Sequence, residues 1–315
     1  MQFIVLVKNN LKKFKIKYNK TFIKGEYSYI HALLCLFWCA IRFGASPDDF
    51  YRYELYKKSN FERNKFITYK RSQKIIKKFN SIESSMVFSD KSLFNSFFSE
   101  YINRDWLDLR KANINEVNCF LLKHDKVILK PLNGGQGNGI FVVTKEDYNT
   151  INFNSYKDYL MEEVLVQNEL MAILNPTSVN TIRVLTFKGH IIECALRIGG
   201  SEAVVDNLHS NGVCAHLDKN SGIIDGLCIN NDMEQFLFHP ISNIVLVGFQ
   251  VPNWKKIIRT VQEAASKISD VSYIGWDVAV LQDGVAIIEG NHDPGHDVVQ
   301  MIAQNGIYQE IRALM

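Results

Sequence analysis

GWDVAVLQDGVAIIEGNHDPGHD, residues 275–297, is the stretch that decides the fold. Its apolar runs on either side of Asp283-Gly284 predict two antiparallel strands joined by a tight turn. Three oxygen-bearing side chains would then gather at one end of this hairpin: Asp277, Glu289 and Asn291. Clustered oxygen ligands suit Mg²⁺, which is hard and octahedral. The alternative is an ordinary hairpin with polar ends.

Upstream of the hairpin, strand patterns dominate the second half of the chain. TIRVLTF (181–187), HIIECALRI (190–198) and GVCAHLD (212–218) are rich in β-branched and apolar residues, and a helix with a 3.6-residue apolar period is expected over 251–269. A strand-rich half with one intercalated helix favours an α+β architecture with antiparallel sheets.

A glycine-rich loop divides KVILKPLNGGQGNGIFVV (126–143) into strand, loop and strand. Gly134, Gly135, Gly137 and Gly139 would let backbone N–H groups approach an anion closely, and Lys130 would point toward the same space. The loop fits neither the Walker A nor the dinucleotide fingerprint. It is therefore either a phosphate cradle or the closure of a simple hairpin.

Two arginines interrupt apolar strands. Arg183 and Arg197 each belong either to the surface of a half-exposed strand or to a cleft, where they would clamp a phosphate. Alternation alone favours the surface for Arg183.

The N-terminal part is expected to be helical from residue 29 to about 80, with a helix start at Ser46-Pro47. YIHALLCLFWCAI (29–41) is shorter than the roughly 20 residues that span a bilayer, so it is interpreted as a buried core helix. Residues 8–24 carry seven lysines and no acid. That run is either an anion-binding surface, for membrane headgroups or acidic polymer, or a solvated helix face.

Composition describes a globular protein of more than one lobe. The chain has 315 residues, 47% of them hydrophobic and 22% charged, with a net charge of +3. This modest charge, without a known binding motif, argues against a nucleic-acid partner. Six cysteines without CxxC pairs, and an N-terminus unlike a signal peptide, favour a cytoplasmic location.

Taken in order, these parts resemble the ATP-grasp superfamily, most closely the sugar-transfer-associated branch found with exopolysaccharide biosynthesis. The resemblance covers about residues 90–300, and NTIRVLTF and GWDVAVLQDG…IEGNHDPG are its most specific pieces. It implies two α+β subdomains that grip ATP between antiparallel sheets. The expected boundaries are a helical region at 1–85, a subdomain with the glycine lid at 86–163, and a subdomain with the metal site at 164–315.

The resemblance also implies roles for individual residues. Lys91 and Lys130 would contact the ATP phosphates beneath the loop of Gly134, Gly135 and Gly137. Adenine would be read by the backbone at Glu162, Glu163 and Val164, and ribose by Glu169. Arg183, Arg197 and, with less specificity, Asn207 would act on the transferring phosphoryl group or the acceptor. Asp277, Glu289 and Asn291 would hold Mg²⁺, with Mn²⁺ as an alternative ion.

The activity that the resemblance implies is ATP-dependent ligation of a carboxylate, either a small molecule or glycan-linked, to an amine. Peripheral contact with a membrane or with polysaccharide machinery is compatible with it. Two rivals are a phosphotransferase and a non-catalytic nucleotide-binding scaffold on the same fold.

The run HDPGHD (292–297) departs from the usual ending of the superfamily. A transition-metal site is its alternative interpretation, built from His292, Asp293, His296 and Asp297.

Overall fold

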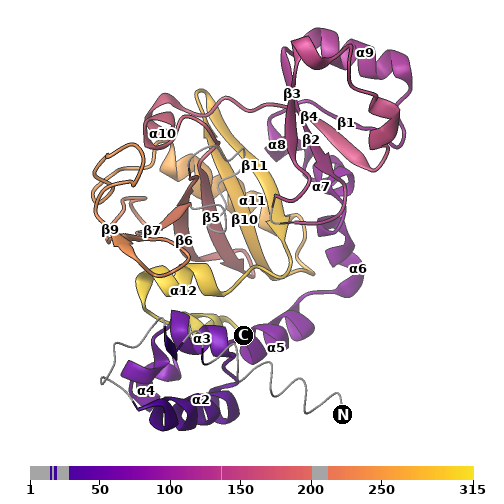
Figure 1. Ribbon diagram of the computed structural model, residues 1–315. Helices are drawn as coiled ribbons and strands as arrows, with labels where there is room; N and C mark the ends of the chain where they lie inside the picture. Colours follow the sequence, from indigo (N-terminus) through magenta and orange to yellow (C-terminus); the bar gives the residue numbers. More distant parts are fainter. Residues whose placement is uncertain (1–14, 16–17, 20–27, 136, 201–211) are drawn as a thin grey trace. The chain divides into compact units, whose positions relative to one another are not determined.

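The computed structural model describes residues 15, 18–19, 28–135, 137–200 and 212–315 (Figure 1). The chain divides into two compact units. Unit 1 comprises Met1–Ile75 and His296–Met315, and unit 2 comprises Ile76–Gly295. The expected three-part division at residues 85 and 163 remains a prediction.

Unit 1 is helical, as the sequence predicts. Its helices include α2 (Tyr29–Phe43), α3 (Pro47–Arg52), α4 (Asn60–Arg63), α12 (Asp297–Ala303) and α13 (Tyr308–Leu314), and α5 (Tyr69–Phe79) begins in it. The predicted helix start at Ser46-Pro47 is confirmed. Asp49 N donates to Ser46 Oγ over 3.1 Å and Ser46 N donates to Asp49 Oδ2 over 2.7 Å, which makes a reciprocal capping box.

Helix α2 is not the buried core helix that its composition predicted. Only three of its residues are fully buried: Ala32, Cys39 and Phe43. The helix carries apolar side chains on all its sides, but the rest of unit 1 packs against one side. Large hydrophobic residues of α2 therefore remain exposed on the other side. In the described residues, no helix has both the length and the hydropathy needed to cross a bilayer.

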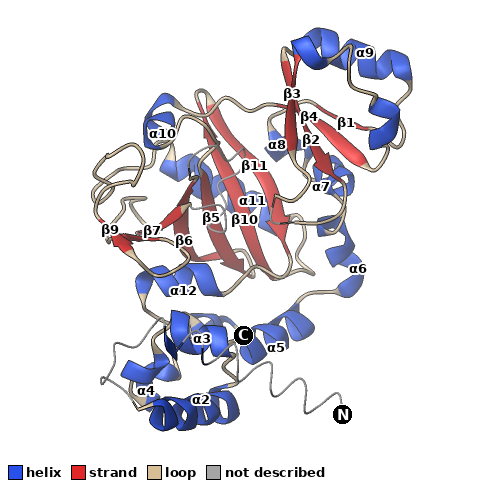
Figure 2. Ribbon diagram, viewed as in Figure 1, coloured by secondary structure: helices blue, strands red, loops and turns tan. Residues whose placement is uncertain are grey.

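Unit 2 contains two antiparallel sheets, drawn in red in Figure 2. The smaller sheet has the order β1-β4-β2-β3, formed by β1 (Trp106–Asp108), β4 (Tyr159–Glu163), β2 (Lys126–Pro131) and β3 (Phe141–Thr144). Helix α9 (Ile114–Lys123) buries Val117 and Leu121 in one cluster with Val127, Leu129 and Met161 of this sheet.

Short helices precede the smaller sheet: α6 (Ile82–Ser85), α7 (Lys91–Phe97) and α8 (Ser99–Ile102). Asp90 caps α7, because its carboxylate accepts from the backbone N–H groups of Ser92 and Leu93.

The larger sheet has the order β11-β10-β5-β6-β7-β8-β9. Its strands are β5 (Thr181–Phe187), β6 (His190–Ile198), β7 (Val213–Leu217), β8 (Cys228–Ile229), β9 (Gln235–Phe236), β10 (Tyr273–Leu281) and β11 (Gly284–Asn291). The predicted hairpin is present, but its turn was misplaced by one residue. Leu281 pairs with Gly284, so Gln282 and Asp283 form the turn and Gly284 already belongs to the strand.

The two faces of the larger sheet differ in chemistry because side chains alternate along each strand. Residues such as Ile182, Leu196 and Trp276 face a hydrophobic core that also contains Ile257 and Val261 of α11 (Trp254–Ser266). Their sequence neighbours point to the opposite face, which carries the polar and charged side chains. Helix α10 (Glu169–Leu174) connects the two sheets along the chain.

Candidate functional site

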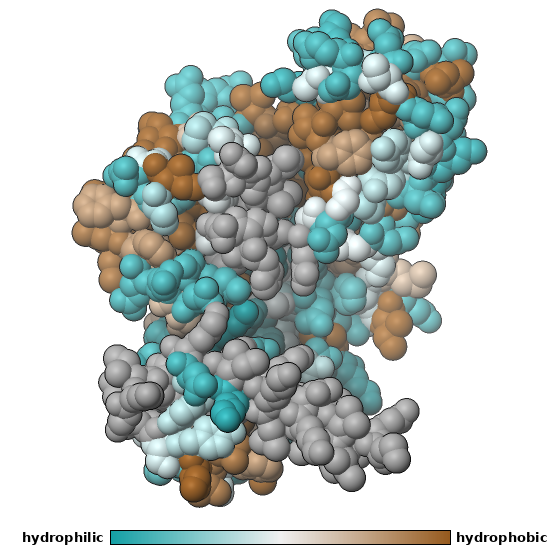
Figure 3. Space-filling model, in the orientation of Figure 1, coloured by the Kyte–Doolittle hydropathy of each residue, from teal (hydrophilic) through white to brown (hydrophobic). Residues whose placement is uncertain are grey.

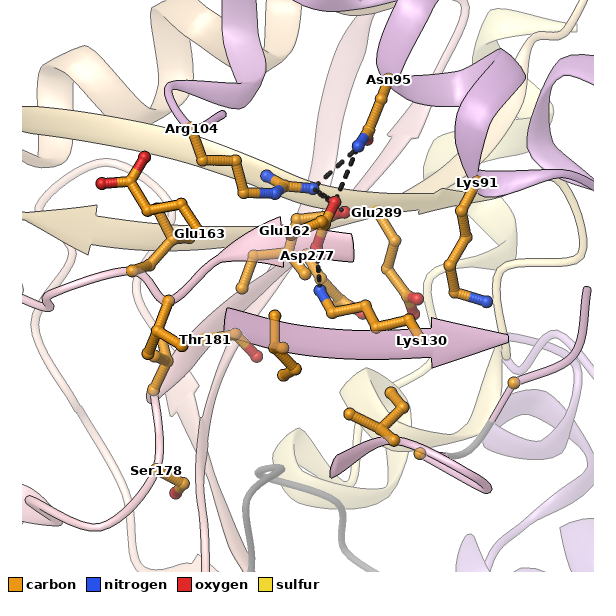
Figure 4. A pocket seen from close by; sticks show the side chains of 18 of the residues that line it. Lys91, Asn95, Arg104, Lys130, Glu162, Glu163, Ser178, Thr181, Asp277 and Glu289 are labelled. Carbon is orange, nitrogen blue, oxygen red and sulfur yellow. Dashed lines mark hydrogen bonds and ion pairs between the residues drawn. The ribbon is translucent and has the colours of Figure 1, made fainter. Parts of the chain in front are cut away.

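A cavity of about 580 Å³ lies in unit 2, lined by residues of both sheets (Figure 4). Most of the residues singled out from the sequence line it: Lys91, Lys130, Gly134, Gly135, Gly137, Glu162, Glu163, Val164, Arg197, Asp277, Glu289 and Asn291. The volume is in the range that small-molecule sites occupy.

Two of the residues to which the resemblance assigns roles, Arg183 and Glu169, do not line the cavity. Arg183 lies behind it, against Asp277. Glu169 is the exposed first residue of α10. Asn207 lies outside the described residues.

Asp277 is the centre of a buried charge cluster. Arg183 is its direct partner across β5 and β10, and its Nε lies 2.7 Å from Asp277 Oδ1. Arg197 Nη1 lies 3.0 Å from Asp277 Oδ2. Burial alone would raise the pKa of Asp277, but the two guanidinium groups lower it below its usual range. The surface position that alternation favoured for Arg183 is therefore wrong.

The glycine of the GWD motif makes room for this cluster. Arg183 Nη1 donates to the carbonyl of Pro294 over 3.0 Å. A Cβ at Gly275 would stand only 2.8 Å from that nitrogen. Any side chain at Gly275 would consequently displace Arg183.

Glu289 is the direct cross-strand partner of Asp277, and the strand pairing shifts register immediately after Asp277. Burial and the neighbouring Asp277 carboxylate raise the pKa of Glu289. Asn291 Nδ2 donates to Glu289 Oε1 over 3.2 Å. Two carboxylates and an amide thus converge in one buried corner. This is a set of hard oxygen donors whose mutual repulsion a divalent cation would relieve, so the residues fit Mg²⁺.

A second buried carboxylate, Glu162 on β4, is held by groups from α7, from β2 and from the loop that follows α8 (Figure 4). Arg104 Nη2 lies 2.9 Å from Oε1, Lys130 Nζ lies 2.5 Å from Oε2, and Asn95 Nδ2 donates to Oε1 over 2.7 Å. Burial would raise its pKa, but the cations of Arg104 and Lys130 lower it to about 2.

Sequence reasoning missed Arg104 and Asn95. Arg104 also donates to the carbonyls of Ile102, Ile287 and Ile288, so it ties α8 and β11 to the carboxylate of Glu162. The available signal was Glu162 itself, because a carboxylate that directly follows an apolar strand segment requires a cationic partner if it is buried.

Lys91 ties the start of α7 to the glycine loop. Its Nζ donates to the carbonyl of Pro131 over 2.9 Å and to that of Gly134 over 3.0 Å. Burial lowers its pKa. Gly134 has φ 108°, a conformation that costs glycine little and other residues much. The loop and its lysine thus present donors along one wall of the cavity.

The polar face of the larger sheet continues beyond the cavity to His216 on β7. Its Nδ1 lies 2.5 Å from Asp225 Oδ1 and its Nε2 lies 3.0 Å from Glu193 Oε1. Hydrogen bonding to Glu193, opposed by burial and assisted by Asp225, raises the pKa of His216 to about 9. The imidazolium form is therefore favoured at neutral pH.

This cluster predicts a pH-dependent stability. Because folding raises the pKa of His216, its stabilisation is complete below about pH 6.5 and is lost as pH rises through about 9. The substitution His216→Asn is expected to lower the free energy of unfolding relative to the wild type. This loss should be larger at pH 6 than at pH 10, by roughly 2–3 kcal/mol. Urea denaturation at several pH values measures it. Exposed His190, changed to Asn, is the control and should give no such trend; a pH-independent deficit for His216→Asn would contradict the assignment.

Another group of metal-ligating residues lies at the edge of the smaller sheet, where ligand atoms of Asp105, His124 and Glu163 come within 4.8 Å of one another. His124 Nε2 lies 3.1 Å from Asp105 Oδ2, and Lys123 forms an ion pair with the same oxygen. Because Lys123 already neutralises Asp105, we assign no metal to this group.

The contacts of His296 and Asp297 do not support a transition-metal site in HDPGHD. His296 Nε2 lies 3.1 Å from Asp49 Oδ1, and Asp297 forms an ion pair with Arg52. Both contacts belong to unit 1.

Comparison with known proteins yields one family and a set of distant structures. The family model described as sugar-transfer associated ATP-grasp matches residues 152–314. No curated protein sequence gives a significant match.

Among solved structures, the ATP-grasp ligase PsnB complexed with a minimal precursor is similar with a TM-score of 0.47 and 13% identity, over 75% of this chain and 62% of that chain. D-alanine–D-alanine ligase from Bacillus anthracis, complexed with ATP, is similar with a TM-score of 0.44 and 12% identity, over 75% of this chain and 70% of that chain. D-alanyl-alanine synthetase A from Vibrio cholerae O1 biovar eltor is similar with a TM-score of 0.46 and 14% identity, over 73% of this chain and 65% of that chain. The chain thus spans less than two thirds of the length of PsnB.

Proposed function

The chain belongs to the sugar-transfer associated ATP-grasp family, and from that premise we propose that it is an ATP- and Mg²⁺-dependent ligase joining a carboxylate to an amine. The observation that carries the proposal is the convergence, around one cavity, of a glycine loop, two lysines and the Asp277–Glu289 pair with its arginines.

The nucleotide would lie in this cavity with its phosphates toward the glycine loop. Lys91 and Lys130 supply ammonium groups on that side, and Gly134, Gly135 and Gly137 leave backbone N–H groups accessible. Adenine would lie at the other end, beside the backbone of Glu163 and Val164, where β4 ends.

The metal ligands would be Asp277, Glu289 and Asn291, which offer oxygen donors on adjacent strands. When bound there, Mg²⁺ would neutralise phosphate charge and orient the oxygens of the transferred group. The chain's own cations add to this: Arg197 lines the cavity, and Arg183 holds Asp277 from behind.

The reaction needs no nucleophilic side chain, since the two substrates react with each other. A carboxylate oxygen of the acid attacks the γ-phosphorus of ATP, the bond to the β-phosphate oxygen breaks, and ADP leaves. The amine nitrogen then attacks the acyl carbon, loses a proton, and phosphate departs as the amide forms. The protein contributes positioning and charge neutralisation, and the glycine loop would exclude water that hydrolyses the acyl phosphate.

The family description supports a substrate connected with sugar transfer. We infer that the acid is a carboxylated sugar or a related acid used in surface-polysaccharide synthesis. The PsnB and D-alanine–D-alanine ligase structures do not bear on this choice.

Product analysis tests the proposal. Purified protein with Mg-ATP, a panel of uronic acids and a panel of amino compounds should release ADP and phosphate only when both partners are present. Release of AMP and pyrophosphate would contradict an acyl phosphate. A stable phosphorylated acid seen by mass spectrometry would assign the protein as a phosphotransferase, and nucleotide binding without turnover across the panels would favour a scaffold.

A further inference from the structure

Arg104 lies where the chain passes from α8, which packs against β11, to the first strand of the smaller sheet. Its guanidinium group donates to the carbonyl of Ile287 over 2.9 Å and to that of Ile288 over 3.1 Å, both on β11. The head of the side chain is therefore anchored on the larger sheet, directly before Glu289.

The same guanidinium group reaches Glu162 on the smaller sheet. Arg104 Nη2 lies 2.9 Å from Glu162 Oε1, and Asn95 Nδ2 donates to that oxygen over 2.7 Å. Arg104 also donates to Asn95 Oδ1 over 3.3 Å, and all three side chains are buried. One oxygen of Glu162 thus accepts from two donors that hold each other. The carboxylate cannot turn without losing both of these bonds.

The other oxygen of Glu162 holds Lys130, whose Nζ lies 2.5 Å from Oε2 (Figure 4). Glu162 is the direct cross-strand partner of Ile128, two residues before Lys130 on β2, so the strand pairing brings the long lysine side chain within reach. An ammonium group has three donors. Pairing with one carboxylate oxygen leaves two N–H groups for the cavity, which Lys130 lines.

The charges of this group favour an anion in the cavity. Arg104 and Lys130 share the single carboxylate of Glu162, so the three side chains together carry one net positive charge. Apolar residues such as Ile128 and Val142 line the same cavity, and hydrophobic residues are visible over the smaller sheet at the upper right of Figure 3. Water screens a charge less in such surroundings than at an open surface. Without Arg104, Glu162 alone would neutralise the ammonium group of Lys130.

We propose that Arg104, together with Asn95, is a positioning residue that fixes the ammonium group of Lys130 through Glu162, so that Lys130 meets a phosphate of the nucleotide already ordered. In this role Arg104 acts on Lys130 and not on the phosphate. The inference rests on the proposed function, because it takes the cavity as the ATP site. A lysine that is ordered beforehand loses little rotamer freedom on binding, which should tighten nucleotide binding by roughly three- to tenfold.

A double-mutant cycle between Arg104 and Lys130 tests this role. Isothermal titration calorimetry gives the Kd of Mg-ATP for the full-length wild type, Arg104→Lys, Lys130→Met and Arg104→Lys/Lys130→Met. Arg104→Lys keeps the charge but loses the planar fork that reaches Glu162 and β11 at once, so it should weaken binding roughly three- to tenfold. In the Lys130→Met background the same substitution should change the Kd by less than about twofold, because no ammonium group remains to be positioned.

A merely structural role for Arg104 would weaken Mg-ATP binding by the same factor in both backgrounds. Asn95→Ala gives a second cycle that leaves both ion pairs of Glu162 in place. It should weaken binding by a smaller factor than Arg104→Lys, and only while Lys130 is present. Arg259→Lys makes the same exchange in an exposed ion pair of α11 and should bind Mg-ATP like the wild type. Circular dichroism and the urea midpoint show whether each variant is folded.

Two results would overturn the positioning role while leaving the nucleotide site intact. One is an equal loss of affinity with and without Lys130, and the other is wild-type affinity in both Arg104→Lys and Asn95→Ala. A wild type that does not bind Mg-ATP would instead overturn the proposed function, and this inference with it.

Discussion

Asp277→Asn is expected to lower ATP turnover by about 10²–10³-fold, because it removes a carboxylate that faces the metal position and two arginines at once. The substitution keeps the shape of the side chain but takes away its charge. Arg183 and Arg197 would then lose the group that aligns them. The measurement is ADP release at saturating Mg-ATP with the substrate pair found in the product analysis.

Glu289→Gln should produce a loss of similar size with a different signature. Arg183 and Arg197 are paired with Asp277, so the loss of the Glu289 carboxylate should raise the Mg²⁺ concentration needed for half-maximal turnover while the arginines stay paired with Asp277. Circular dichroism and the urea midpoint report whether each variant is folded. Full activity in either variant would remove that residue from the metal site.

Arg104→Met is expected to have the largest effect on stability, a loss of about 3–5 kcal/mol. The Arg104 side chain is 2% exposed and that of Glu162 is 1% exposed. Removing the charge of Arg104 leaves Lys130 as the remaining ion-pair partner of Glu162 in the described part of the chain. The carbonyls of Ile287 and Ile288 would lose their donor as well. Urea denaturation followed by tryptophan fluorescence gives the unfolding free energy.

Two further variants isolate the buried charge as the cause. Arg104→Met/Glu162→Gln should recover a large part of the loss, since a neutral amide costs less to bury than an unpaired carboxylate. Arg259→Met removes an exposed helical ion pair with Glu263 and should change stability by less than about 1 kcal/mol. A loss below about 1 kcal/mol in Arg104→Met itself would contradict the account of Glu162 as a carboxylate that depends on this cation.

The gathering of Asp277 and Glu289 at one end of the hairpin could be predicted from the sequence. Their direct pairing could not, because regular alternation from the turn would place the two side chains on opposite faces, and the register shift after Asp277 brings them together. The turn was placed one residue too late, since the choice between Gln282-Asp283 and Asp283-Gly284 depends on backbone angles that composition does not reveal. The capping signal at Ser46 was reliable because a helix cap depends on residues close together in the sequence.

Arg104 could not be predicted, because its partners come from β4 and β11 and no local pattern connects those strands to the end of α8. Helix α2 was misinterpreted for a related reason. Its sequence shows that all sides of the helix are apolar, but the side that becomes buried depends on tertiary packing. The same limit applies to Arg183, whose alternation pattern was compatible with either face of its strand.

The strand order of the larger sheet also bears on how the protein folds. Strands β5 and β6 form one hairpin and β10 and β11 another, both closed by short turns. The contact between β5 and β10 joins segments separated by residues 188–272, and such long-range closure is entropically expensive and slow. Because Arg183 lies on one hairpin and Asp277 on the other, their ion pair forms only once this closure has occurred. In a chain whose two hairpins have formed but have not yet paired, the β10–β11 hairpin already carries every proposed metal ligand. Arg183 is not yet beside Asp277 in that state.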